Sequence, residues 1–135
     1  MTAKISDNDI EKIISHWVKS SDDDYQTMES LLKSGSYSWA LFLGHIVIEK
    51  LLKAVYIKKK HEHAPLTHNL YRLAELSSLD ISSEQSDWLD TITSFNINAR
   101  YDDYKREFYL SCTESYSKEW IDKIKELKVW IKKEL

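Results

Sequence analysis

Residues 37–60 are the segment that most constrains the fold of this chain. Between Trp39 and Ile48, apolar side chains fall on nearly every face of the helix that this segment is expected to form. A helix that is apolar all round is surrounded by other helices, whereas a surface helix carries a single apolar stripe. The segment ends in Lys58 to Lys60, positive charges that suit the negative end of a helix dipole. We therefore predict a central helix over 37–60.

The rest of the chain also favours helices. Two glycines and one proline among 135 residues leave few points at which a helix must break. A stripe spaced by three and four residues predicts a first helix that ends near Ser34, before Gly35. Its members are Ile10, Ile14, Trp17, Ser21, Asp24, Met28 and Leu31. We predict an all-α chain that forms a single domain over residues 1–135.

Three later helices follow from capping residues and spacing. Thr67 is the expected N-cap of a short helix of about ten residues. Ser82 and Gln85 form an expected capping box for the next helix, and the last helix is expected from Thr113 to the C-terminus. Residues 96–110 show no clean period, so we predict a polar and aromatic connector there. Functional residues often lie on such connectors.

The sequence predicts a cytoplasmic protein. Residues 1–7 are polar and lack the apolar core of a secretory signal. Gly44 and His45 interrupt the longest apolar stretch, so we expect no insertion into a membrane. Cys112 is the only cysteine, and no disulfide can form within the chain.

Charge is unevenly distributed although the net charge is only −3. Residues 50–72 hold six basic side chains and one acid, Glu62, whereas residues 73–99 hold five acids and neither Lys nor Arg. This asymmetry could steer an anionic partner to one side of the molecule. An uneven solvated surface without a partner explains the same pattern equally well.

Charged side chains also interrupt the apolar faces of two helices. Asp24 falls within the stripe of the first helix, and His45, Glu49 and Lys53 share one face of the central helix. A buried charge is unfavourable unless it is paired, so we expect a buried polar network of Asp24, His45 and Glu49. In it, Glu49 is expected to meet a cation from another helix. The candidate cations are Lys50, Lys53 and Arg100.

No metal ion or cofactor is predicted. His61 and His63 lie close together, but no Cys or His follows at the spacing of a zinc site. Gly35 and Gly44 are the only glycines, which excludes a glycine-rich phosphate loop and a serine nucleophile elbow. For His68, completion of a helix cap is the simplest interpretation.

The order and spacing of five blocks resemble the HEPN domain family. The blocks are Trp17 to Leu32 on the first helix, Gly35-Ser-Tyr-Ser-Trp-Ala-Leu-Phe, Glu49-Lys-Leu-Leu-Lys-Ala, Thr67-His-Asn-Leu and Ala99-Arg-Tyr. The resemblance implies an up-and-down antiparallel bundle of four long helices plus a short helix. It further implies a role in nucleotide or RNA transactions, frequent homodimers, and frequent pairing with a minimal nucleotidyltransferase as toxin and antitoxin.

Many members of this family are metal-independent ribonucleases that carry an Arg followed after four to six residues by a His. In this chain Arg100 is followed by Tyr101-Asp-Asp-Tyr-Lys-Arg-Glu and by no His, so the resemblance favours binding over cleavage. We predict a groove whose cations contact phosphate and whose tyrosines stack on bases. The predicted groove residues are Lys50, Lys53, His68, Arg100, Tyr101 and Tyr104.

Two alternatives stay open. One is a ribonuclease toxin with an altered site built on Arg100, Lys105 and either His45 or His68. The other is a structural subunit that docks on a nucleotidyltransferase through its last helix. Trp120 and Trp130 suit such docking, although a core position is the better expectation for Trp120.

Overall fold

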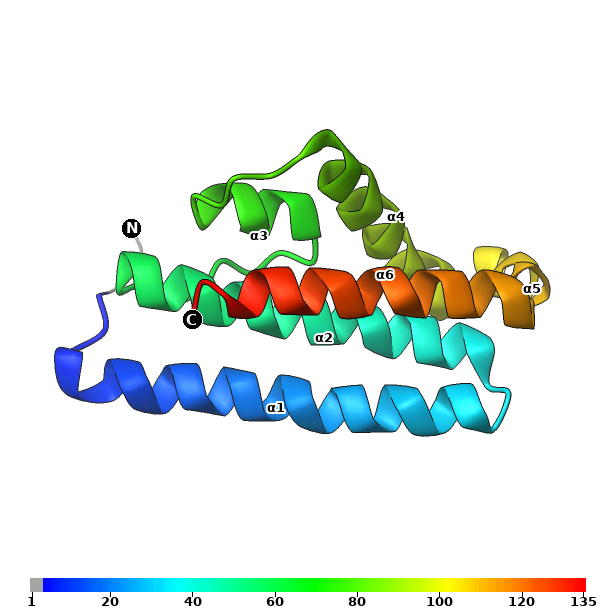
Figure 1. Cartoon of the computed structure of the whole chain (residues 1–135), viewed down its shortest axis with the longest axis horizontal. Coiled ribbons are helices and arrows are strands. Elements are labelled where there is room, and N and C mark those ends of the chain that lie inside the picture. The colour runs from blue at the N-terminus through cyan, green and yellow to red at the C-terminus, as the bar shows by residue number, and fades with distance from the viewer. Residues whose placement is uncertain (1–3) are drawn as a thin grey trace.

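The computed structural model describes residues 4–135, which form six helices (Figure 1). The first three residues of the polar N-terminal segment lie outside the described part. The helices are α1 (Asp7–Lys33), α2 (Tyr37–Lys60), α3 (Leu70–Leu76), α4 (Ser83–Arg100), α5 (Asp102–Ser111) and α6 (Glu114–Lys132). The all-α prediction is confirmed.

Helix α2 is the centre of the molecule, as predicted, and it packs against every other helix. Helix α1 runs antiparallel to α2, α4 runs obliquely back across it, and α6 lies beside α2 in the same direction (Figure 1). The long helices α1, α2, α4 and α6 therefore alternate up and down along the chain, with α3 as the short helix. The expected bundle is confirmed in this order.

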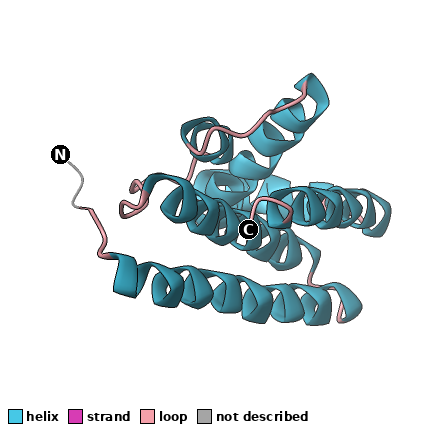
Figure 2. Ribbon diagram, turned by 60° about the vertical axis from the view of Figure 1, so that its left-hand side comes forward, coloured by secondary structure: helices cyan, strands magenta, loops and turns pink. Residues whose placement is uncertain are grey.

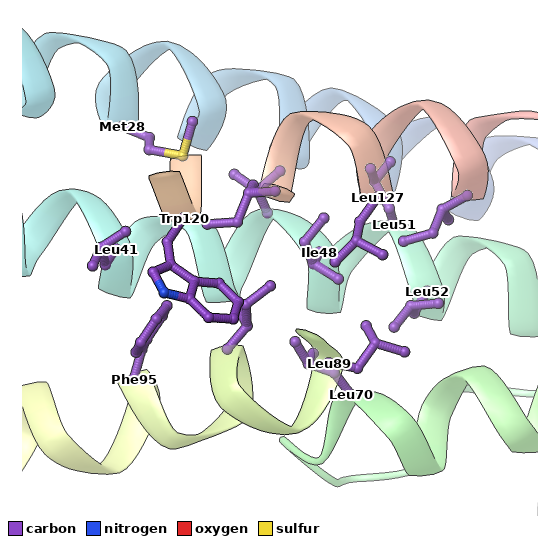
Figure 3. Close-up of a cluster of buried hydrophobic side chains, with 14 of the residues drawn as sticks. Met28, Leu41, Ile48, Leu51, Leu52, Leu70, Leu89, Phe95, Trp120 and Leu127 are labelled. Carbon is purple, nitrogen blue, oxygen red and sulfur yellow. The ribbon is translucent and has the colours of Figure 1, made fainter. Parts of the chain in front are cut away.

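Large apolar side chains from α2, α4 and α6 interlock in the main core (Figure 3). Phe95 packs edge-on against Trp120, whose ring centroid lies 5.7 Å away, and Trp120 is a core residue as expected. Helices α2 and α6 approach closely at Gly44. A Cβ added there would lie 2.4 Å from Ile124 Cδ1, so only glycine fits this crossing without movement.

The connections between helices are short apart from the two segments that flank α3 (Figure 2). Gly35, with φ of +79°, ends α1 in a Schellman motif in which Gly35 N donates to Leu32 O and Ser36 N to Leu31 O. The capping box of Ser82 and Gln85 is present as predicted, and Thr113, where the last helix was expected to begin, is the N-cap of α6.

The short helix α3 differs from its prediction. Asn69 is its N-cap, because the Asn69 side chain accepts a hydrogen bond from Arg72 N, and the helix has seven residues. The Thr67 hydroxyl instead accepts a hydrogen bond from Asn69 N, in the loop before the helix. Asn ranks above Thr as an N-cap residue, so propensity itself favours Asn69 over Thr67.

The predicted connector over residues 96–110 was wrong. Helix α4 continues to Arg100, and α5 begins after a single extended residue, Tyr101. Phe108 is the only buried residue of α5, so the sequence lacks the apolar stripe that reveals a helix packed on a core. The acidic pair Asp102 and Asp103 at its first turn is the signal that could have indicated this helix.

Candidate functional site

Asp24 on α1 pairs with Lys50 on α2. The Lys50 Nζ lies 2.6 Å from Asp24 Oδ2 and also donates to the Ser20 hydroxyl at 2.7 Å. Both charged side chains are about a quarter exposed. The predicted neutralisation of Asp24 is therefore observed, and Lys50 links the two helices.

A second group of polar side chains surrounds Glu49. We call His45, Glu49, Lys53 and His68 the α2 polar cluster. Glu49 Oε2 accepts from Lys53 Nζ at 3.1 Å, and its other oxygen lies 2.8 Å from His68 Nδ1. Lys53 also lies over the indole ring of Trp17, 5.5 Å from the ring centroid. Both Glu49 and Lys53 are buried, and each has its opposite charge in contact.

His45 is the buried member of this cluster and contacts the main chain of His68. Its Nε2 lies 3.0 Å from the carbonyl oxygen of His68, which can only accept, so Nε2 carries the hydrogen. Its Nδ1 is buried and has no hydrogen-bond partner within residues 4–135. Burial lowers the pKa of His45 below its ordinary value of 6.5, against the opposite effects of the His68 carbonyl and the charge of Glu49. A neutral His45 therefore holds the loop before α3 against α2.

The network differs from the prediction in two ways. Asp24 and Glu49 belong to separate groups, and Glu49 finds its cation one turn along its own helix instead of on another helix. Spacing predicts that Glu49 and Lys53 share a face, but a carboxylate at i and an ammonium at i+4 can satisfy each other without help. Arg100 donates to Asn96 Oδ1 at 3.2 Å on its own helix and pairs with neither Asp24 nor Glu49.

The basic segment 50–72 is occupied by internal contacts. Each of its six Lys and Arg side chains has a polar partner. The pairs are Lys50 with Asp24, Lys53 with Glu49, Lys58 with the main-chain carbonyl of Leu135, Lys59 with Glu134, Lys60 with the Ser78 hydroxyl, and Arg72 with Glu75. This segment offers less free positive charge than its sequence suggests.

Free cations occur instead on α5. Ser38 and Trp39 at the start of α2 face Asp102, Lys105, Arg106 and Tyr109 of α5 across a cavity of about 350 Å³. We call it the α5 cleft. Within the described chain neither Lys105 nor Arg106 forms an ion pair with a carboxylate. Two cations therefore meet one acid, Asp102, at this cleft.

Aromatic rings complete the cleft. Lys105 Nζ lies 5.3 Å from the ring centroid of Trp39, an arrangement typical of a cation–π contact. Trp39 is 43% exposed and Tyr109 is 62% exposed, so both rings are accessible. The first turn of α2 has neither a side-chain cap nor an acidic residue, which leaves its positive helix end uncompensated beside Ser38.

The six residues predicted for one groove fall into two sets. Lys50, Lys53 and His68 contact carboxylates beside α2. Arg100, Tyr101 and Tyr104 lie where α4 meets α5, with both tyrosines about half exposed.

The prediction did not include Trp39, Arg106 and Tyr109 in the site, and Lys105 entered only the ribonuclease alternative. The adjacent Lys105-Arg106 pair, followed closely by Tyr109, was the available signal.

Two further observations concern metals and membranes. Among residues 4–135, His, Cys, Asp and Glu side chains nowhere gather in a group of three or more that could hold a metal ion. In the same part of the chain, each helix is too short or too polar to cross a bilayer.

Comparison with known proteins identifies the class. The family model of the HEPN domain matches residues 14–135, so this chain belongs to the HEPN domain family. In that general sense it is a nucleotide- or RNA-related module.

Among solved structures, the crystal structure of TT1696 from Thermus thermophilus superposes with a TM-score of 0.76. It is 18% identical, and the match covers 90% of this chain and 98% of that one. This likeness concerns the fold. No curated protein sequence matches the chain.

Proposed function

We propose that this protein binds a nucleotide, free or as part of an RNA strand, in the α5 cleft. The observation that supports the proposal is the convergence of unpaired cations and accessible aromatic rings on one cavity. A volume of about 350 Å³ lies at the lower end of small-molecule sites, which suits one nucleotide unit.

The charges of the cleft suit a phosphate. Lys105 and Arg106 carry charges that no neighbouring carboxylate neutralises through an ion pair in residues 4–135. An Arg guanidinium can donate two parallel hydrogen bonds to phosphate oxygens, and a Lys ammonium adds a mobile point charge. Asp102 at the same cleft favours contact with neutral donor groups such as ribose hydroxyls over a second phosphate.

The aromatic rings suit a base. An exposed indole such as Trp39 can stack on any base, with a contribution of about 1–3 kcal/mol per base. Tyr109 lines the same cavity from the opposite side, on α5. A longer RNA strand would continue towards Arg100, Tyr101 and Tyr104, which we retain from the predicted groove as an extension of the site.

A salt-dependent titration tests this proposal. Binding of a labelled single-stranded RNA of mixed sequence is measured by fluorescence anisotropy, with adenosine monophosphate as competitor. One phosphate contacted by both cations predicts a slope of log K against log salt of about −0.7. Lys105→Ala with Arg106→Ala should bring the slope close to zero and weaken binding by about tenfold or more.

The matched control removes two exposed lysines of α1, Lys12 and Lys33. It changes the net charge equally and should preserve both the slope and the affinity. Absence of binding by the wild type at low salt overturns the proposal, as does equal weakening by the control.

A ribonuclease activity is the second candidate, and the contact between Glu49 and His68 favours it. Glu49 orients the His68 ring through Nδ1, and the His68 side chain is 61% exposed, so a substrate can reach the ring. His45, at 1% exposure, cannot reach a substrate. Purified protein should then degrade RNA in the presence of a chelator, and His68→Gln should abolish the activity. Intact RNA removes this candidate.

We also propose a homodimer, with a nucleotidyltransferase as a partner protein in a cytoplasmic toxin and antitoxin pair. The exposed apolar side chains around α5 support an interface at this end. They are Ile97 and Leu110, which do not line the α5 cleft. Sedimentation velocity should show a dimer, and a monomer at every concentration contradicts it. Co-purification with the product of the adjacent reading frame tests the partner.

A further inference from the structure

A second cavity lies between the start of α4 and the end of α6, and it shares no lining residue with the α5 cleft. Its volume is about 390 Å³. We call it the α4–α6 groove, and its lining combines apolar and acidic side chains. The lining residues are Ser82, Glu84, Gln85, Trp88, Glu126, Leu127, Val129, Trp130 and Lys133.

The acids of this groove lack partners. Glu84 and Glu126 form no ion pair with another residue of the described chain, and Lys133 is the single cation among the lining residues. Asp87 and Asp90 continue the negative charge along exposed positions of α4. Glu84 is the acid of the stretch 73–99 that lines the groove, and together with Glu126 it makes the lining complementary to a positively charged partner.

The aromatic rings here already accept a cation. Lys123 Nζ lies 4.3 Å from the ring centroid of Trp120 and 5.6 Å from that of Trp88. Trp88 therefore contacts an ammonium group on one side and lines the groove on another. Trp130 lines the groove as well. Val129, another lining residue, is 59% exposed, so an apolar side chain is accessible to a partner here.

We propose that the α4–α6 groove docks a basic segment of a partner protein, one that places a Lys or Arg side chain between the indoles and the carboxylates. Apolar residues of the same segment cover the exposed side chain of Val129. Tryptophan and arginine are both enriched among the residues that dominate binding energy at protein interfaces. The groove is separate from the α5 cleft, so this proposal does not depend on nucleotide binding.

The test uses three short labelled peptides of alternating composition: Arg with Leu, Glu with Leu, and Arg with Ser. We expect the Arg and Leu peptide to bind most tightly. Glu84→Gln with Glu126→Gln should weaken its binding by about tenfold, a loss of about 1.4 kcal/mol. Val129→Asn should weaken it severalfold and should leave the Arg and Ser peptide unaffected.

Controls separate docking from general attraction between charges. Glu11→Gln with Glu29→Gln on α1 removes the same charge and should leave the affinity unchanged. The α5 cleft variant with Lys105→Ala and Arg106→Ala should bind the peptide as the wild type does. The proposal is overturned by equal weakening in the α1 variant, by the absence of peptide binding, or by displacement with free arginine at the peptide's own concentration.

Discussion

The α2 polar cluster and the α5 cleft contain the same kinds of side chain in opposite situations. In the cluster, Lys53 is buried and contacts Glu49, so its charge serves the fold. In the cleft, Lys105 is exposed and contacts only the face of Trp39 among charged or aromatic groups of the described chain. A basic side chain therefore indicates a ligand-binding site only where no carboxylate of the same chain already neutralises its charge.

The energetics of the two regions differ accordingly. A paired charge in a buried position contributes little net stability, but its removal leaves the partner charge unsolvated. An exposed cation can be removed with almost no effect on the fold, because water solvates everything that remains. Stability measurements should therefore respond to the cluster and binding measurements to the cleft.

The largest expected effect follows from breaking the buried pair. Glu49→Leu leaves Lys53 buried without its carboxylate and should reduce the free energy of unfolding by about 3 kcal/mol. Chemical denaturation followed by circular dichroism measures this loss. Adding Lys53→Met to the same protein should recover most of it, because no charge then stays buried. A double variant as unstable as the single one contradicts a paired cluster.

A smaller effect, on binding of RNA, is expected from replacing the Trp39 ring of the α5 cleft. Trp39→Leu should weaken binding of single-stranded RNA by about tenfold, since loss of one stacked base is worth about 1–3 kcal/mol. The free energy of unfolding should change little, because Trp39 is 43% exposed. Isothermal titration and denaturation of the same preparation provide both values. A large loss of stability with unchanged affinity would assign Trp39 to the fold.

The pH dependence of stability sharpens the comparison further. Because burial lowers the pKa of folded His45, the unfolded chain binds a proton at a higher pH than the folded one does. Stability contributed by neutral His45 is therefore complete above its ordinary pKa of 6.5 and declines as the pH falls towards the folded pKa. His45→Phe should flatten the change in unfolding free energy between about pH 7 and pH 5. His63→Gln, at an exposed position, should not.

The smallest effect is expected at an exposed ion pair. Arg72 and Glu75 lie 2.7 Å apart with side chains about half exposed. Such pairs contribute about 0–1 kcal/mol, so Arg72→Ala should lower the unfolding free energy by about 0.5 kcal/mol or less. A loss comparable to that of Glu49→Leu would remove the distinction between buried and exposed pairs.

The sequence was sufficient for most of the fold because the features that specify it are local. Each of these features specifies structure within a few turns of helix. They are the apolar segment 37–60, Gly35 and the capping box at Ser82. Helix α5 escaped prediction because a surface helix with one buried residue, Phe108, has no stripe.

The candidate site was harder to predict because it depends on pairing across the fold. Lys50 meets a carboxylate 26 positions earlier in the chain, and no spacing rule indicates that contact. Trp39 and Lys105 come together only because α5 folds against the start of α2.

The most direct test of the account is a chemical-shift titration of isotope-labelled protein with a short single-stranded RNA at low salt. We expect the indole N–H signal of Trp39 and the amide signals of Lys105, Arg106 and Tyr109 to shift together and saturably. Signals from Lys53 and the loop at His68 should stay in place. Saturable shifts confined to the α2 polar cluster, with α5 unmoved, would contradict the assignment of binding to the exposed cations.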